Sequence, residues 1–308
     1  MQNKRYGIIG IGHCCQDSIC TIESYPPEDG STHILSIDDT QGGGAVATAM
    51  VAAARLGVKT AIIANLGDDE TGGKIQSGFE SYGVDTECIQ LIPGGRSSSS
   101  VVMVDPAHGS RTKFPFRDNL PPIDFTPQKQ EAISQSSILH LDGTNYGNAL
   151  AAARIARENG VTISLDGCSR QKENALNLQL AEMADILITN AVYPQAVTGC
   201  ETREEALMQL AGLGHKKAVM TTLGSEGVMA VIDGCIVRFP AFCVAAVDTT
   251  GAGDVFHGAF LTAWLEGRRT EECIRFAAAV AALKCQKPGG RSGIPTRAET
   301  EAFLARYS

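Results

Sequence analysis

No segment of this 308-residue chain approaches the run of about 18 apolar residues that a membrane-spanning helix needs. The polar start, Met1 to Tyr6, leads directly into a strand-like segment and is not followed by the long apolar core of a secretory signal. Acidic residues outnumber basic ones and the net charge is −8, so the basic surface that nucleic-acid binding requires is missing. We therefore expect a soluble, cytoplasmic protein that binds neither membranes nor nucleic acid.

Cysteine pairs at metal-ligand or redox spacing are also missing, although the chain has ten cysteines. No two of them form a Cys-x-x-Cys motif, which argues against a zinc site and against a dithiol redox site. Most are scattered singly through apolar or helical segments. We expect reduced thiols that pack as small apolar side chains.

What the sequence does contain is a regular alternation of short apolar runs and alanine-rich amphipathic stretches. The predicted strands cover 60–65, 137–141, 162–166, 186–189, 218–222 and 228–232, and the predicted helices cover 45–56, 148–159, 203–213 and 271–285. Buried strands that alternate with helices are typical of a parallel sheet covered on both faces. We therefore predict an α/β fold in which ligands bind at the carboxyl ends of the strands.

Two regions interrupt this alternation, because strand-like residues follow one another there with no helix between them. They span residues 13–41 and 97–117, and the second contains a predicted hairpin with its turn at 105–109. We interpret the two regions as a small β-sheet that stands off the core as a lid. The lid is inserted in a single predicted domain, residues 1–308.

The most informative segment is the glycine-containing turn Asp248-Thr249-Thr250-Gly251-Ala252-Gly253-Asp254. Glycines let the backbone approach a ligand closely, and N–H groups at the start of the helix that we predict from Asp254 attract anions. A phosphoryl group in transfer carries such negative charge. The Asp254 carboxylate can take the proton of an attacking hydroxyl, but an aspartate that only caps the helix would give the same local pattern.

Together with the following Phe256-His257-Gly258-Ala259, this segment resembles the C-terminal signature of the PfkB family of carbohydrate kinases. The resemblance covers nearly the whole chain and implies a ribokinase-like fold of three α/β/α layers with a small β-sheet lid. It also implies ATP-dependent phosphorylation of a hydroxyl group. The implied catalytic base is Asp254, and the implied anion hole is the backbone of Gly251, Ala252 and Gly253.

A segment near the N-terminus, Gly42 to Ala49, resembles the first signature of the same family. The resemblance places Gly43 and Gly44 against the hydroxyls of the substrate. Two carboxylates that accept hydrogen bonds from hydroxyls, Asp17 and Asp142, match acidic positions of the same pocket. Thr48 stands where the family has an asparagine, and a hydroxyl offers fewer donors than an amide.

The resemblance also implies an ATP site. Its candidate residues are Thr222, Gly224 and Gly227 in a turn after a strand, and Ala278 and Ala282 beside the adenine. Asn190 begins the family's Asn-x-x-Glu motif, which organises Mg²⁺ and phosphates, but Tyr193 occupies the glutamate position. Because tyrosine does not replace a carboxylate near Mg²⁺, we expect the nucleotide phosphates to hold most of the ion. The loop 286–295, with Asp248, Thr250 and Gly290, is implied to bind a monovalent cation such as K⁺.

The segment 247–295 is especially similar to the sulfofructose kinase branch of the family. That branch holds its sulfonate with an arginine where this chain has Thr144, so we do not carry that substrate over. Four basic residues cluster in or beside the predicted lid: Arg96, Arg111, Lys113 and Arg117. They suggest an anionic sugar bound by Arg111 and Lys113, although solvated charges on an exposed hairpin would give the same pattern.

We predict a kinase for a sugar or sugar derivative that uses ATP and Mg²⁺. The resemblance also implies a homodimer through the edges of the lid, and exposed edge strands need such cover. One alternative is a nucleoside or vitamin-like alcohol kinase on the same fold, with Phe114 and Phe116 as the candidate floor for a base. A second alternative is a non-catalytic sugar or nucleotide sensor, which Tyr193 favours. A dinucleotide oxidoreductase is disfavoured, because the glycines between Gly7 and Gly12 have the wrong spacing.

Overall fold

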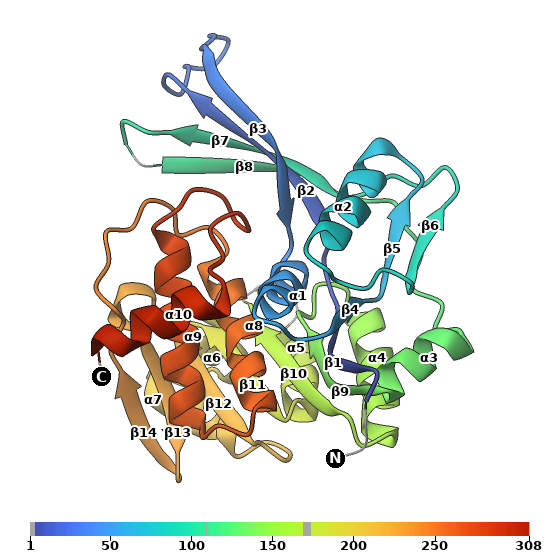
Figure 1. Cartoon of the computed structure of the whole chain (residues 1–308), viewed down its shortest axis with the longest axis vertical. Helices are drawn as coiled ribbons and strands as arrows, with labels where there is room; N and C mark the ends of the chain where they lie inside the picture. Colours follow the sequence, from blue (N-terminus) through green and yellow to red (C-terminus); the bar gives the residue numbers. More distant parts are fainter. Residues whose placement is uncertain (1–3, 109, 169–173, 308) are drawn as a thin grey trace.

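The computed structural model describes residues 4–108, 110–168 and 174–307, and an eight-stranded sheet lies at its centre (Figure 1). The strand order is β14-β13-β12-β11-β10-β9-β1-β4. The strands are β1 (Tyr6–Ile11), β4 (Thr60–Ile62), β9 (Ser136–Leu141), β10 (Thr162–Gly167), β11 (Ile186–Asn190), β12 (Ala218–Thr222), β13 (Val228–Ile232) and β14 (Cys235–Phe239). Neighbours from β4 to β12 are parallel, and the last two strands add antiparallel pairs. The predicted α/β fold with a mostly parallel sheet is confirmed.

Helices cover both faces of this sheet, which explains why apolar residues predominate on both sides of its central strands. Successive residues of a strand point to opposite faces, and Ile8 and Ile9 accordingly lie in two different buried clusters. One cluster includes side chains of α1 (Ala45–Arg55), α2 (Glu70–Ser81), α8 (Ala252–Leu265) and α9 (Thr270–Cys285). The other includes side chains of α3 (Pro127–Ser134), α4 (Tyr146–Glu158), α5 (Asn174–Met183), α6 (Tyr193–Thr198) and α7 (Arg203–Ala211). The remaining helix, α10 (Arg297–Leu304), packs beside α9.

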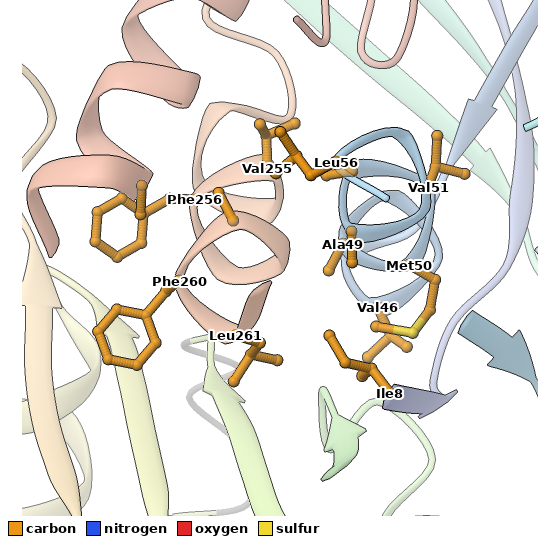
Figure 2. Close-up of a cluster of buried hydrophobic side chains, with 14 of the residues drawn as sticks. Ile8, Val46, Ala49, Met50, Val51, Leu56, Val255, Phe256, Phe260 and Leu261 are labelled. Atoms are coloured by element: carbon orange, nitrogen blue, oxygen red, sulfur yellow. The ribbon is translucent and has the colours of Figure 1, made fainter. Parts of the chain in front are cut away.

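The two helices α1 and α8 lie side by side over the sheet (Figure 2). Gly258 makes this approach possible, because a Cβ atom at that position would stand 2.2 Å from the carbonyl oxygen of Ala49. The contact is completed by buried apolar side chains such as Val46 and Leu261. This packing fixes the start of α1 relative to the start of α8.

A second, four-stranded sheet stands off the main body (Figure 1). It consists of β2 (Cys15–Ile22), β3 (Ile34–Gly43), β7 (Ser99–Asp105) and β8 (Ser110–Phe116), in the order β3-β2-β7-β8. The central pair β2 and β7 is parallel, and the outer pairs are antiparallel. We call these strands the small sheet. They come from the two regions predicted to form it, and the hairpin of β7 and β8 is confirmed.

Local boundaries differ from the prediction in two places. The expected strand 60–65 is divided into β4 and β5 (Ala64–Gly67), and β5 pairs with β6 (Ile89–Ile92) in a separate two-stranded sheet. The helix expected from Asp254 begins at Ala252, because Gly251 has a φ of 71° and ends the preceding turn. Within the described ranges no helix is long and apolar enough to cross a bilayer.

Candidate active site

Polar residues gather where four neighbouring parallel strands end. Asp142 follows β9, Asp166 lies near the end of β10, and Asn190 and Thr222 end β11 and β12 directly opposite one another. Because these ends share one edge of the sheet, they lie where the sequence predicted the ligand site.

Asp254 lies in the first turn of α8, above this edge. The residue at the N-cap is Gly251, and no side chain caps this helix, so Asp254 is not the helix cap that its sequence position allowed. First-turn N–H groups of a helix have no acceptor within the helix. Of the three amides predicted to form the anion hole, that of Ala252 donates to the Thr249 carbonyl at 3.2 Å. Gly251 and Gly253 are therefore the better candidates for binding an anion.

The surroundings of Asp254 raise the pKa of its carboxyl from 3.8 to about 6. Burial is the main cause, and the charge of Asp142 adds to it. The positive charges of Arg291, Lys113 and Lys284 act in the opposite direction. A carboxylate with such a pKa is ionised at neutral pH and is a stronger base than an ordinary aspartate, which suits proton abstraction from a hydroxyl.

Asp17 reaches the site from the small sheet. The Lys113 ammonium lies 3.1 Å from Asp17 Oδ1, and the Ser100 hydroxyl donates to the same oxygen. A Cβ atom on Gly43 would stand 2.6 Å from Asp17 Oδ2, so this glycine lies against the carboxylate. The predicted neighbours Asp17, Gly43 and Lys113 are therefore brought together. Arg111 lies in β8 opposite Val104, and its side chain lies outside the described part of the structure.

The glycine loop before α1 is tightly packed. Gly44 has a φ of 100°, and a Cβ atom there would stand 1.9 Å from the His13 carbonyl oxygen, so only glycine fits. The Asp142 carboxylate accepts hydrogen bonds from the backbone N–H groups of His13 at 2.9 Å and Thr144 at 2.8 Å. Asp142 thereby fixes the connection between β1 and β2 at His13, against which Gly44 packs, to the end of β9.

Arg291 is a site residue that the sequence analysis did not single out. Its side chain is buried, and it donates to the Gly43 carbonyl at 3.0 Å and to the Thr48 hydroxyl at 3.4 Å. Thr48, at the family's asparagine position, is thus buried and bonded to an arginine. The guanidinium also lies over the Phe79 ring, 5.3 Å from its centroid. A lone arginine in a glycine-rich loop carries no signal of these contacts, because its partners are distant in sequence.

A buried polar cluster lies one turn below Asp254, and the sequence analysis missed it as well. His257 Nε2 is 3.6 Å from Asp166 Oδ1, and the rings of His140 and His257 are 5.4 Å apart. Burial and the charges of Asp254 and Asp142 raise the pKa of Asp166. Burial lowers the pKa of His140 to about 4 and that of His257 well below its ordinary value. The two imidazoles are therefore neutral at physiological pH.

The predicted nucleotide residues border the strand ends. The Asn190 amide oxygen accepts from the N–H groups of Val192 and Tyr193, at 3.1 and 2.9 Å. Tyr193 is a core residue, 1% exposed, whose hydroxyl donates to the Asn177 carbonyl at 3.1 Å. The Tyr193 side chain is therefore part of the buried core. Gly224 and Gly227 have positive φ and shape the turn after Thr222.

Two further groups were predicted to serve ATP. Ala278 and Ala282 lie on α9, where Ala278 is partly exposed and Ala282 is buried. Their contact with adenine stays a prediction. Among the described residues there is no cluster of three His, Cys, Asp or Glu side chains able to hold a metal ion. The donors present fit Mg²⁺ only as an ion that ATP phosphates largely coordinate.

The three residues predicted for a monovalent cation are also neighbours. The Asp248 carboxylate accepts from the Thr250 N–H at 2.8 Å and from the Gly289 N–H at 2.9 Å. The Gly290 carbonyl lies 3.1 Å from the position that a Cβ atom on Gly251 would take. The C-terminal loop is therefore packed against the turn that leads to the anion hole.

Comparison with known proteins agrees with this geometry. The profile of the pfkB family carbohydrate kinases matches residues 8–297. A ribokinase from Haemophilus influenzae is 35% identical over 268 residues, which cover 85% of this chain and 87% of that protein. A nucleoside kinase from Methanothermobacter thermautotrophicus is 28% identical over 309 residues, which cover 97% of this chain and 96% of that protein.

Solved structures show the same similarity. The ribokinase of Thermotoga maritima has a TM-score of 0.85 and 25% identity, with 97% of this chain and 99% of that chain covered. The ribokinase of Arabidopsis thaliana, complexed with ribose and ATP, has a TM-score of 0.85 and 26% identity, with 97% and 98% covered. The chain therefore has the ribokinase-like fold and belongs to the pfkB family of carbohydrate kinases, which are ATP-dependent enzymes.

Proposed function

We propose that this kinase transfers the γ-phosphate of ATP to a hydroxyl of a sugar or sugar derivative, with Asp254 as the general base. One observation carries the proposal. A carboxylate whose pKa is raised to about 6 lies in the first turn of α8, directly after the glycine turn whose Gly251 and Gly253 amides are the candidates for binding an anion.

Different residues bind the acceptor, remove its proton and stabilise the transferred phosphoryl group. Asp17, Asp142 and the backbone at Gly43 hold the acceptor hydroxyls, because carboxylate and carbonyl oxygens accept their protons. Asp254 removes the proton from the attacking hydroxyl, and the amides of Gly251 and Gly253 stabilise the charge on the transferred phosphoryl group. Positioning of the hydroxyl against the γ-phosphate supplies most of the rate acceleration, since the protein itself forms no covalent bond in phosphoryl transfer.

Mg²⁺ belongs to this proposal as part of the ATP complex. A bound Mg²⁺ neutralises charge on the phosphate oxygens. On the protein side, Asn190 and Asp254 are the residues that would reach the ion through water. The Asn190 oxygen is already engaged in its own turn, and Tyr193 is turned into the core. The nucleotide therefore supplies most of the coordination.

A sugar fits better than a nucleoside as the acceptor. Strand register places Phe114 opposite Val101, which pairs with Ser18. Asp17 is the preceding residue of β2 and points to the other face of the small sheet. Phe114 therefore faces away from Asp17 and offers no floor for a base in the described arrangement. Sulfofructose is not proposed, because Thr144 stands at the position of the branch's arginine and offers no positive charge to a sulfonate.

The small sheet is proposed to act as the lid of this single domain. It carries Asp17 and Lys113 above the glycine loop of α1. Closure over the sugar would exclude water, which otherwise accepts the phosphoryl group. The proposal extends to an anionic group on the sugar, because Lys113 has about half of its side chain exposed and lies at the rim of the site.

The general-base role is tested with Asp254→Asn in an ADP-release assay over a panel of sugars. Loss of the base is expected to lower kcat by about 100-fold or more. The wild-type rate is expected to fall below about pH 6, where the Asp254 carboxylate takes up a proton. Asp124→Asn, which changes an exposed aspartate, is the matched control. Full turnover by Asp254→Asn would remove the proposed mechanism.

The anionic part of the substrate is tested separately with Lys113→Ala. We expect KM to rise about tenfold for sugar acids or sugar phosphates and much less for matched neutral sugars, because a charged contact is lost only with the former. Arg117→Ala, an exposed basic residue next to β8, is the control. An equal change in KM for charged and neutral sugars would show that Lys113 only orients Asp17.

A further inference from the structure

A buried ammonium group lies beside the anion hole. Lys284 is in the last turn of α9 and is 0% exposed. Its Nζ donates to the backbone carbonyl of Asp248 at 2.8 Å. Hydrogen bonds from Thr250 lower the pKa of the Asp248 carboxyl against the effect of burial, and the Lys284 charge adds to this lowering. The same charge opposes the burial that raises the pKa of Asp254. Lys284 therefore acts electrostatically on both ends of the turn that forms the anion hole.

Burial of a lysine is costly unless other groups compensate its charge. Three kinds of compensation are present here: the Asp248 carbonyl, the nearby Asp248 carboxylate, and the negative end of the α9 dipole. Carbonyl and carboxylate oxygens are also the groups that bind a small monovalent cation. The ammonium thus occupies a place where the surrounding dipoles favour positive charge.

A free K⁺ ion does not fit the same residues. Family resemblance implies a site made by carbonyl oxygens at Asp248, Thr250 and Gly290, but the Asp248 carbonyl is bonded to Lys284. Both oxygens of the Asp248 carboxylate accept backbone N–H groups, those of Thr250 and Gly289. An added K⁺ would lie against an ammonium of like charge, and each of these oxygens already accepts one hydrogen bond.

We propose that the Lys284 ammonium replaces the monovalent cation, so that the charge which supports the anion hole is built into the chain and turnover does not depend on K⁺. The inference rests on the proposed kinase activity. The Lys284 hydrogen bond joins the turn to the end of α9. Two further hydrogen bonds join the same segments, because the N–H groups of Val247 and Asp248 donate to the Cys285 carbonyl, at 2.7 and 3.1 Å. The same turn presents Gly251 and Asp254 to the phosphoryl group.

The wild-type enzyme gives the first test. Rates are measured at equal ionic strength with K⁺, Na⁺ or N-methylglucamine as the only monovalent cation, after exhaustive removal of K⁺ and NH₄⁺. We expect the same kcat in all three solutions. A several-fold stimulation by K⁺ would overturn the proposal, and this result does not depend on the folding of any variant.

The variant Lys284→Met gives the second test, because methionine keeps much of the apolar stem and removes the charge. In N-methylglucamine its kcat is expected to fall by about 100-fold, the order of effect of a lost anion-hole group, and K⁺ or NH₄⁺ is expected to restore part of it. Lys59→Met, at an exposed position directly before β4, should match wild type in every cation. Unchanged activity of Lys284→Met without K⁺ would contradict the assigned role.

Thermal unfolding separates this inference from the proposed function. K⁺ should raise the Tm of Lys284→Met relative to Na⁺ or N-methylglucamine and leave that of wild type unchanged, because only the variant has an open cation site. This readout needs no substrate. If wild type phosphorylates no acceptor, the proposed function fails while the cation result still decides the role of Lys284. If K⁺ stabilises both proteins equally, Lys284 does not replace the ion.

Discussion

At the scale of single residues, burial and the surrounding charges together set the pKa of Asp254. Burial raises the pKa of Asp254 most, the charge of Asp142 adds to this, and the charges of Arg291, Lys113 and Lys284 act in the opposite direction. The net result is a carboxylate that is ionised at neutral pH yet basic enough to accept a proton from a hydroxyl. Sequence reasoning identified Asp254 through its glycine turn. It missed Arg291 and the role of Lys284, because their charges act through backbone groups far away in the chain.

The same balance predicts how Asp254 affects stability. Its pKa in the folded protein, about 6, exceeds its ordinary value of 3.8, so folding favours the protonated form. The stabilisation is complete below pH 3.8 and is lost as the pH rises through 6. Asparagine cannot ionise, so Asp254→Asn is expected to be more stable than wild type at pH 8, by at most about 3 kcal/mol, with the difference vanishing near pH 4.

Denaturant unfolding at pH 4 and pH 8 measures this difference. Asp124→Asn, at an exposed position, should show no such trend. Equal stability of Asp254→Asn and wild type at pH 8 would mean that burial does not disfavour the Asp254 charge. Higher stability and lower activity of Asp254→Asn would show that Asp254 is needed for activity although it destabilises the folded protein.

At the scale of elements, the sequence predicted most of the sheet because its strands are continuous apolar runs between amphipathic helices. The strands 218–222 and 228–232 were predicted with the bounds that β12 and β13 have. The split between β4 and β5 was not foreseen, because periodicity does not show where one apolar run passes from one sheet to another. The start of α8 was placed two residues late, because left-handed geometry at Gly251 is a backbone property.

The α1 and α8 pair gives a prediction at this scale. Gly258→Ala places a Cβ atom 2.2 Å from the Ala49 carbonyl, so the two helices must separate. We expect a loss of about 1–3 kcal/mol in the free energy of unfolding. We also expect a lower kcat/KM, because α1 carries Thr48 after the glycine loop and α8 carries Asp254.

Gly78→Ala is the matched control for this substitution. Gly78 also lies inside a helix, α2, but a Cβ atom there meets nothing within 4 Å. Alanine is expected to stabilise the protein there by about 0.5–1 kcal/mol and to leave kcat/KM unchanged. If both alanine variants behave alike, helix propensity rather than the close approach of α1 and α8 decides the effect.

At the scale of the whole molecule, the small sheet has two different faces. One carries Asp17, Ser100 and Lys113 toward the site. The other face carries Ile37, Val101 and Phe114. Ile37 pairs with Cys20, and Val101 pairs with both Ser18 and Phe114. Cys20 and Ser18 point to the opposite face from Asp17, because successive residues of β2 alternate between the two faces. These apolar side chains are 61%, 38% and 56% exposed. Such an apolar face on a protruding sheet is typical of an interaction surface.

We therefore predict that two copies of the chain pair through this face, whereas the family resemblance implied a homodimer through the edges of the lid. Ile37→Glu and Phe114→Glu place a charge in the proposed contact and are expected to shift the protein from dimer to monomer in sedimentation velocity runs. Met208→Glu is the control, because it also replaces an exposed apolar side chain with a charge. Met208 is 40% exposed and lies on α7, so this variant should remain a dimer. If wild type sediments as a monomer at all concentrations, the apolar face serves another purpose. If only the two small-sheet variants dissociate and their KM also rises, the second copy helps to hold the lid over the sugar.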